Sequence, residues 1–115
     1  MKVIIAGSRT CNDYNILEEA IKNSGFTINT VISGCARGAD KLGERWAKNN
    51  GIVIMKYPAN WNKNGKKAGY LRNIEMAKVS NALIILWDGK SLGSKHMIEI
   101  AKKYKLHIYI SYFVQ

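Results

Sequence analysis

Residues 3–9 read VIIAGSR, four apolar residues followed directly by a glycine, a serine and an arginine, and this stretch decides the fold. A β-branched run of this length is typical of a buried strand, and a glycine directly after it lets the backbone turn closely. A strand, a tight turn and then a helix form the opening unit of parallel α/β sheets. The rest of the chain repeats this unit.

Five short β-branched runs alternate with four helix-like stretches along the chain. We expect strands at residues 2–6, 30–33, 52–56, 82–87 and 107–112, which are nearly continuous apolar runs, as strands covered on both faces require. Right-handed crossovers then place helices on both faces of the sheet. The sequence therefore predicts an α/β fold, a single Rossmann-like three-layer domain over residues 1–115, with a five-stranded parallel sheet in the order 3-2-1-4-5.

The composition limits the class of protein. The chain is 47% hydrophobic and has a single proline, which is ordinary for one globular domain. Its apolar start is too short for a signal-peptide core or a membrane span, so we expect a cytoplasmic protein without a membrane partner. Cys11 and Cys35 lack the paired spacing of a zinc site or a disulfide framework. We interpret both as reduced thiols and expect neither a metal nor a cofactor.

The formal net charge of +10 is the one unusual bulk property, and its field favours anionic partners. Most of the charge comes from lysines scattered over expected helix surfaces, where plain solvation explains them. The tighter group of Lys63, Lys66 and Lys67 beside Trp61 is a better candidate for contact with an anion.

The carboxyl ends of parallel strands meet at one edge of the sheet, so the segments that follow the first four strands are expected to lie together. They are residues 7–9, 33–40, 57–69 and 87–94, and they concentrate glycine, serine, arginine and aspartate. Such residues at a glycine turn or a helix start suit phosphate and ribose. The candidates for contact with a nucleotide here are Gly7, Ser8, Arg9, Ser33, Gly34, Arg37, Gly38, Asp40, Trp61, Gly93 and Ser94.

Several of these residues also have a structural interpretation. Asp40 and Ser91 are typical helix caps, and Trp61 either covers a bound base or packs under the sheet edge. The Gly-x-Gly-x-x-Gly fingerprint of dinucleotide dehydrogenases and the complete Gly-x-x-x-x-Gly-Lys-Ser/Thr loop of P-loop nucleotidases do not occur in the sequence; Gly89-Lys90-Ser91 lacks the first glycine of that loop, where Ile84 stands. Their absence disfavours both classes of nucleotide enzyme.

Four motifs in this order resemble a known family. They are residues 5–9, 33–40, 68–76, and 87–89 together with 93–94. The chain resembles the SLOG superfamily, specifically its small YspA/YpsA-related branch. Relatives of that branch include the LOG, or lysine decarboxylase-like, nucleotide phosphoribohydrolases and the Rossmann domain of the DNA-processing protein DprA.

The resemblance implies recognition of nucleotides or NAD-derived nucleotide ligands, of which ADP-ribose is one. It places the glycine and serine loops on phosphate, and the aspartates Asp40 and Asp88 or the amide of Asn73 near ribose. Many members look like sensors rather than catalysts, and relatives often look dimeric, so the resemblance also implies a homodimer.

Catalysis is the point at which the sequence departs from the LOG enzymes. Those relatives cleave an N-glycosidic bond with an arginine on the third helix and a glutamate after a Gly-Gly-x-Gly-Thr loop. Arg72 stands where that arginine would, but His96 stands where the glutamate would. A histidine is a poor substitute for a carboxylate beside an oxocarbenium-like state, which leaves Glu75 or Asp88 as catalytic candidates with Arg72.

Three functions follow, and each stays open at this point. The first is a module that binds or senses a nucleotide. The second is a nucleotide hydrolase that uses Arg72 with Glu75 or Asp88. The third is a DprA-like protein that binds single-stranded nucleic acid, a hypothesis suggested by the shared motif at residues 33–40 and by the net charge of +10.

Overall fold

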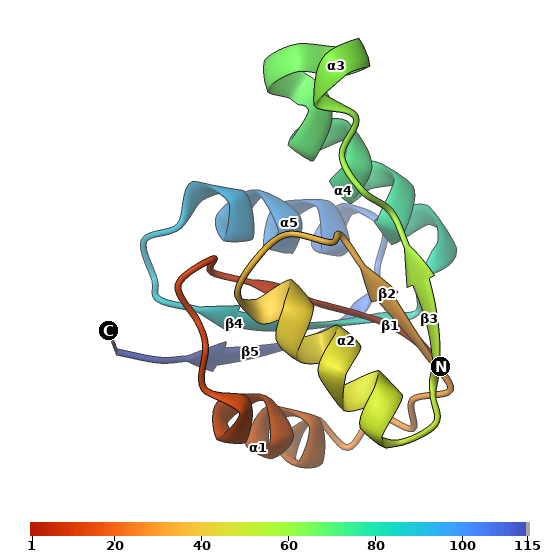
Figure 1. Ribbon diagram of the computed structural model, residues 1–115, viewed down its shortest axis with the longest axis vertical. Coiled ribbons are helices and arrows are strands. Elements are labelled where there is room, and N and C mark those ends of the chain that lie inside the picture. Colours follow the sequence, from red (N-terminus) through yellow and green to blue (C-terminus); the bar gives the residue numbers. More distant parts are fainter. Residues whose placement is uncertain (115) are drawn as a thin grey trace.

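The computed structural model describes residues 1–114 and contains one five-stranded sheet, drawn edge-on in Figure 1. Its order is β3-β2-β1-β4-β5 and every neighbouring pair is parallel. Both features confirm the predicted α/β Rossmann-like architecture. The strands are β1 (Lys2–Gly7), β2 (Thr30–Ser33), β3 (Val53–Lys56), β4 (Ala82–Trp87) and β5 (His107–Tyr112).

Four main helices cover the sheet, two on each face (Figure 1). Helices α1 and α2 pack on one face, and α4 and α5 pack on the other. Their bounds are α1 (Tyr14–Ser24), α2 (Ala39–Asn49), α4 (Ala68–Val79) and α5 (Leu92–Lys103). The result is the three-layer arrangement that right-handed crossovers impose on a parallel sheet.

The strands at the centre of the sheet divide the core between its two faces. Along β1, Val3 and Ile5 face the α1 and α2 layer, whereas Ile4 and Ala6 face the α4 and α5 layer. Strand β4 alternates in the same way, and its residues 82–86 are all buried. This alternation explains why the central strands read as continuous apolar runs in the sequence.

The segment between β3 and α4 differs from the long loop expected over residues 57–69. It contains a short helix, α3 (Trp61–Asn64), followed by the 3-10 turn η1 (Gly65–Lys67). The Asn60 side chain holds the start of α3, because its Oδ1 accepts a hydrogen bond from the Lys63 N–H at 3.0 Å. None of α3 is buried, so no apolar period marks it in the sequence.

Within residues 1–114, no helix combines the length and the apolar character needed to cross a membrane. Both cysteines are free thiols; Cys11 is buried and Cys35 is half-buried. The same residues contain no group of three or more side chains placed to hold a metal ion.

Candidate functional site

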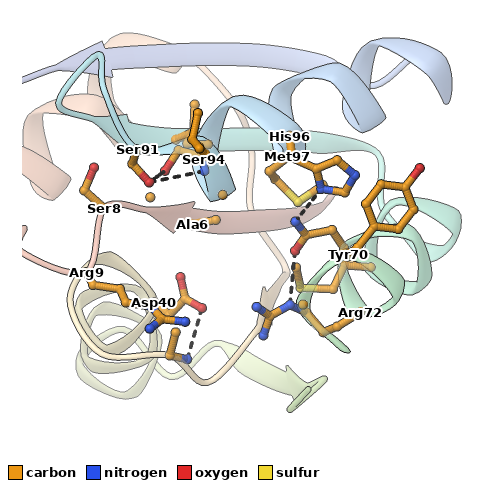
Figure 2. A pocket seen from close by; sticks show the side chains of 18 of the residues that line it. Ala6, Ser8, Arg9, Asp40, Tyr70, Arg72, Ser91, Ser94, His96 and Met97 are labelled. Atoms are coloured by element: carbon orange, nitrogen blue, oxygen red, sulfur yellow. Dashed lines mark hydrogen bonds between the residues drawn. The ribbon is translucent and has the colours of Figure 1, made fainter. Parts of the chain in front are cut away.

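A cleft of about 560 Å³ opens at the carboxyl ends of the strands. It lies between β1 and β4, where the chain changes direction across the sheet and where ligands bind in folds of this kind. Figure 2 shows side chains from both sides of the sheet converging on it. Its walls come from the turn after β1, the start of α2, the α3–α4 segment, and the turn after β4 with the start of α5.

The turn after β1 is fixed by a close approach of two backbones. Gly7 has φ +151°, and a Cβ at this position would overlap the carbonyl oxygen of Leu86 on β4. The next residue, Ser8, donates its N–H to that same oxygen at 2.9 Å. The Ser8 hydroxyl accepts a hydrogen bond from the Asp88 N–H at 3.2 Å. This serine therefore ties together the turns after β1 and β4.

The start of α2 is also packed against the turn after β1. Gly38 is the N-cap with φ +80° and no side-chain capping bond, and a Cβ there would overlap the backbone of Ser8 and Arg9. The first N–H of the helix, from Ala39, donates to the Ser8 carbonyl oxygen at 3.3 Å. The sequence suggested unpaired amides at this helix start; the Ala39 amide is engaged within the protein, whereas the N–H groups of Asp40 and Lys41 precede the first helical bond, which runs from Leu42 N–H to Gly38 O at 3.2 Å.

Asp40 is buried in the first turn of α2 and lines the cleft. It does not cap its helix; instead its Oδ2 accepts a hydrogen bond from the Ala36 N–H at 3.2 Å. Burial raises the pKa of Asp40 to about 6, and the Ala36 N–H and the Arg72 guanidinium oppose that rise. An ionised carboxylate only accepts hydrogen bonds, so this wall of the cleft suits hydroxyl donors better than phosphate.

On the opposite wall of the cleft, a chain of hydrogen bonds through the side chains of Arg72, Asn73 and His96 connects α4 to α5 (Figure 2). We call it the relay. Arg72 donates from Nε to the Asn73 Oδ1 at 3.1 Å and from Nη1 to the carbonyl oxygen of Gly34. The bond from Arg72 orients the Asn73 amide, so its NH₂ group faces the Nδ1 of His96 at 3.1 Å. His96 Nδ1 is therefore an acceptor, which leaves the imidazole proton on Nε2.

The Nε2 atom of His96 is buried and has no hydrogen-bond partner among the described residues. Tyr70 stacks on the imidazole, with ring centroids 4.1 Å apart and an angle of 30° between the planes. Burial lowers the pKa of His96, so the neutral ring is favoured at neutral pH. A neutral ring agrees with the relay, because a proton on Nδ1 would face the NH₂ of Asn73.

The start of α5 is arranged differently from the start of α2. Ser91 caps the helix, with its Oγ accepting from the Ser94 N–H at 3.4 Å, and the first helical hydrogen bond runs from Lys95 N–H to Ser91 O at 3.1 Å. The N–H groups of Leu92 and Gly93 precede that bond, so the helix supplies no acceptor for them. A Cβ on Gly93 would meet no atom within 4 Å, so packing does not require glycine there.

Asp88 supports this helix start from the turn after β4. Its Oδ1 accepts hydrogen bonds from the N–H groups of Lys90 and Ser91, both at 2.9 Å. The N–H groups of Ser91 and Lys90 lower the pKa of Asp88, so the carboxylate is ionised at neutral pH. It orders the turn that presents α5 to the cleft.

A second, smaller pocket of about 330 Å³ adjoins the cleft. Four residues line both spaces, namely Arg9, Ala36, Trp61 and Arg72. The remaining wall of the smaller pocket comes from the loop after β2 and the segment before α3, namely Gly34, Cys35, Arg37, Pro58 and Ala59. We call this space the arginine pocket.

The structure brings most of the sequence-predicted site residues to these two spaces. The cleft holds Gly7, Ser8, Arg9, Asp40, Trp61, Arg72, Asn73, Asp88, Gly93 and Ser94. The arginine pocket holds Gly34 and Arg37 together with the shared Arg9, Trp61 and Arg72.

Three predicted residues line neither space. Ser33 is buried and donates its hydroxyl to Glu44 Oε2 at 2.7 Å, Gly38 packs against the turn after β1, and Glu75 lies on an exposed position of α4. Buried side-chain partners such as Glu44 carry no signal in a single sequence, which is why Ser33 reads as a ligand contact.

Several cleft residues were not among the predicted site residues, and Tyr70 and His96 are the two of them whose side chains contact one another at the relay. The spacing of Tyr70 and Asn73, three residues apart on one helix, is the signal that could have placed the tyrosine on the same face as the asparagine. The contact between Asn73 and His96 joins two helices, and no local pattern reveals such a contact.

Two comparisons with known sequences cover this site. A family model matches the part from β1 to α3, and a similar protein matches most of the chain. The sequence model of the YspA, cpYpsA-related SLOG family matches residues 1–64. This chain belongs to that family. The Gene 61 protein of Mycobacterium phage D29 is similar to this SLOG-family chain, at 34% identity over 112 residues and 89% coverage of each.

The fold of this SLOG-family chain is also found in a larger solved structure. DNA processing protein A (DprA) from Streptococcus pneumoniae matches it with a TM-score of 0.76 at 19% sequence identity. The match covers 95% of this chain and 49% of the DprA chain, so this chain spans about half the length of that protein. At this identity the likeness supports the Rossmann-like fold alone.

Proposed function

We propose that the cleft binds a nucleotide or an NAD-derived nucleotide such as ADP-ribose, and that the protein captures or senses this ligand. The observation that carries the proposal is the start of α5. There the N–H groups of Leu92 and Gly93 have no helical acceptor, and the glycine leaves them uncovered. Free amides at a helix N-terminus favour an anion such as phosphate, and the helix dipole adds to the attraction.

The other walls supply what the rest of a nucleotide needs. The buried carboxylate of Asp40 is a hydrogen-bond acceptor for ribose hydroxyls. Trp61 and Tyr70 line the cleft from the α3–α4 segment and are each 52% exposed, so the ring of Trp61 and the face of Tyr70 that does not stack on His96 are available to a base. A cleft of about 560 Å³ lies within the usual range for small-molecule sites.

The two carboxylates that the sequence suggested for catalysis, Glu75 and Asp88, favour binding without cleavage. Glu75 is exposed and outside the cleft lining. Asp88 lines the cleft, but its Oδ1 holds two backbone N–H groups and its pKa is lowered. An ionised carboxylate engaged in this way is a poor general acid for an N-glycosidic bond.

A thermal-shift panel tests the proposal. At a ligand concentration of about 100 times Kd, a ligand that binds only the native state adds about 2.7 kcal/mol, which raises Tm by roughly 10 °C in a small domain. We expect such a shift with AMP, NAD or ADP-ribose, its loss in Arg72→Ala, and its retention in Arg45→Ala, whose guanidinium lies over Tyr14 and lines neither pocket. A flat panel would contradict the proposal.

Chromatography of the same ligands after incubation separates sensing from hydrolysis. We expect AMP and NAD to be recovered intact, with no released base. Release of base that is lost in Asp88→Asn would instead support the hydrolase. A cytoplasmic setting suits either activity, since the two free thiols then stay reduced.

Single-stranded nucleic acid is the second candidate ligand, and one surface favours it. Trp61 is half exposed at the start of α3, and Lys63, Lys66 and Lys67 are all exposed around it. An aromatic face surrounded by cations is typical of single-strand binding. If this surface binds a backbone, affinity for an oligonucleotide should fall steeply with salt. A flat salt response would remove this candidate.

A further inference from the structure

The four arginines of the chain are distributed very differently from its fourteen lysines. Three of them, Arg9, Arg37 and Arg72, line the arginine pocket. No lysine lines either pocket. Arginine presents a planar fork of donors that matches phosphate, whereas lysine is a hydrated point charge. The bulk charge of the protein is therefore a lysine surface, and the arginines form a separate, local feature.

The nearest acidic group to these guanidinium groups is the buried Asp40, which interacts with Arg72 and Arg9 from the cleft side and balances at most one of the three charges. No carboxylate lines it, and none of the three arginines makes a salt bridge within residues 1–114, where the ion pairs join lysines to Glu44. Arg72 is half-buried. Gathering like charges around one space is unfavourable unless anions balance them, and one Asp40 carboxylate does not balance three arginines, so the arginine pocket has the charge of an anion site.

The arginine pocket and the cleft adjoin each other, because they share part of their lining. Arg9, Arg72 and Trp61 stand on the boundary, since they line both spaces. Arg37 belongs to the arginine pocket alone, and Gly93 belongs to the cleft alone. A ligand seated with one phosphate at the start of α5 can therefore extend past the boundary toward Arg37.

Resting on the proposed function, we infer that the arginine pocket is a second phosphate subsite and that the ligand is a nucleotide carrying two phosphate groups. The first phosphate lies on the amides of α5, and the second lies among Arg9, Arg37 and Arg72. A nucleoside 3′,5′-bisphosphate and a pyrophosphate-bridged nucleotide both supply this chemistry. A mononucleotide fills only the cleft.

Calorimetric titration of the full chain with AMP, adenosine 3′,5′-bisphosphate and ADP-ribose tests the inference. We expect all three to bind and at least one two-phosphate ligand to bind about tenfold or more tightly than AMP, because charge-assisted hydrogen bonds to arginine are strong. The tighter of the two names the source of the second phosphate.

The matched variants are Arg37→Ala and Arg45→Ala. Both remove one exposed arginine from or beside α2, so they change the net charge equally. We expect Arg37→Ala to lose most of the gain from the second phosphate, while its AMP affinity changes no more than that of Arg45→Ala. Melting temperatures of both variants check that each is folded.

The outcomes separate this inference from the proposed function. If no nucleotide binds, both are wrong. If AMP binds but a second phosphate adds nothing, or if Arg37→Ala and Arg45→Ala behave alike, the second subsite is wrong and the proposed function stands. If an eight-residue oligothymidine binds more tightly than both two-phosphate ligands and Arg37→Ala removes that binding, the cleft and the arginine pocket serve a nucleic-acid backbone and the small-ligand assignment is overturned.

Discussion

Two helices begin at the cleft, and their first turns look alike in sequence but differ in the structure. The turn before α2 contains Gly38, where the backbone of the turn after β1 leaves no room for a Cβ. The Ala39 amide of this helix is already bonded to Ser8, and the next two amides share their turn with the buried Asp40 carboxylate. The turn of α5 contains Gly93, which no neighbour crowds, and its first amides have no helical acceptor. A glycine that packing explains is a structural residue, whereas a glycine beside free donors in a cleft points to a ligand.

Substitution of Gly38 should produce the largest effect, because it tests the packed side of this comparison. A Cβ would lie 2.5 Å from the carbonyl oxygens of Ser8 and Arg9, at φ +80°. We expect Gly38→Ala to lose about 3 kcal/mol or more of the free energy of unfolding, measured by urea denaturation. A variant as stable as the wild type would show that the two turns are not packed as described.

Asp40 sharpens the comparison from the first turn of α2. Burial raises its pKa to about 6, so between about pH 4 and pH 6 the folded protein holds a proton that the unfolded chain has released. Stability should fall as the pH rises through this window, by up to about 3 kcal/mol, and should remain at the lower level above it.

The matched variant is Asp40→Asn, which keeps an oxygen for the Ala36 N–H. Urea denaturation above pH 6 should find it more stable than the wild type, and the difference should shrink as the pH falls toward 4. The same substitution should weaken nucleotide binding, because a charged acceptor for ribose is lost. If the difference in stability between Asp40→Asn and the wild type did not change with pH, the raised pKa of the buried Asp40 would be contradicted.

Gly93→Ala tests the open side of the comparison, where the effects on stability and binding should separate. Alanine is a better helix former than glycine, so the free energy of unfolding should stay equal or rise by up to about 1 kcal/mol. The added methyl group covers the amides of α5, so AMP affinity should fall by about tenfold or more. Equal affinity of Gly93→Ala and the wild type would place the phosphate elsewhere.

Tyr70→Ala should produce the smallest effect, a change in the pKa of His96, which belongs to the relay between α4 and α5. The tyrosine ring covers the imidazole of His96, and burial is the main reason why the pKa of His96 is lowered. Removing the ring should move that pKa up toward its ordinary value, as followed by NMR titration of the ring protons. The resonances of Phe26, which packs near His107 away from this contact, serve as the internal control for an intact fold.

The sequence predicted the fold because its signals are local. Five apolar runs specify the strands one at a time, and the parallel order then follows from crossover rules. The same logic predicted that the turns after β1, β2 and β4 would meet at one edge. It did not distinguish Gly38 from Gly93, because that difference depends on which backbone lies opposite each residue.

The side-chain contacts of the site were beyond local reasoning for the same reason. Ser33 reads as a ligand contact until its bond to the buried Glu44 is seen, and Arg72 gains its position from the carbonyl of Gly34, far away in the sequence. Both contacts join an α-helix to the end of β2 or its loop. A single sequence, when it is not aligned with related sequences, contains no record of such pairs.

An ¹⁵N-resolved NMR titration with AMP tests the central claim most directly, since it reports on the two helix starts in one experiment. We expect the largest amide shifts at Leu92 and Gly93 and small shifts at Ala39, whose N–H is held by Ser8. Saturable shifts centred on Ala39 with none at Leu92 and Gly93 would contradict it, and the anion site would then belong to α2.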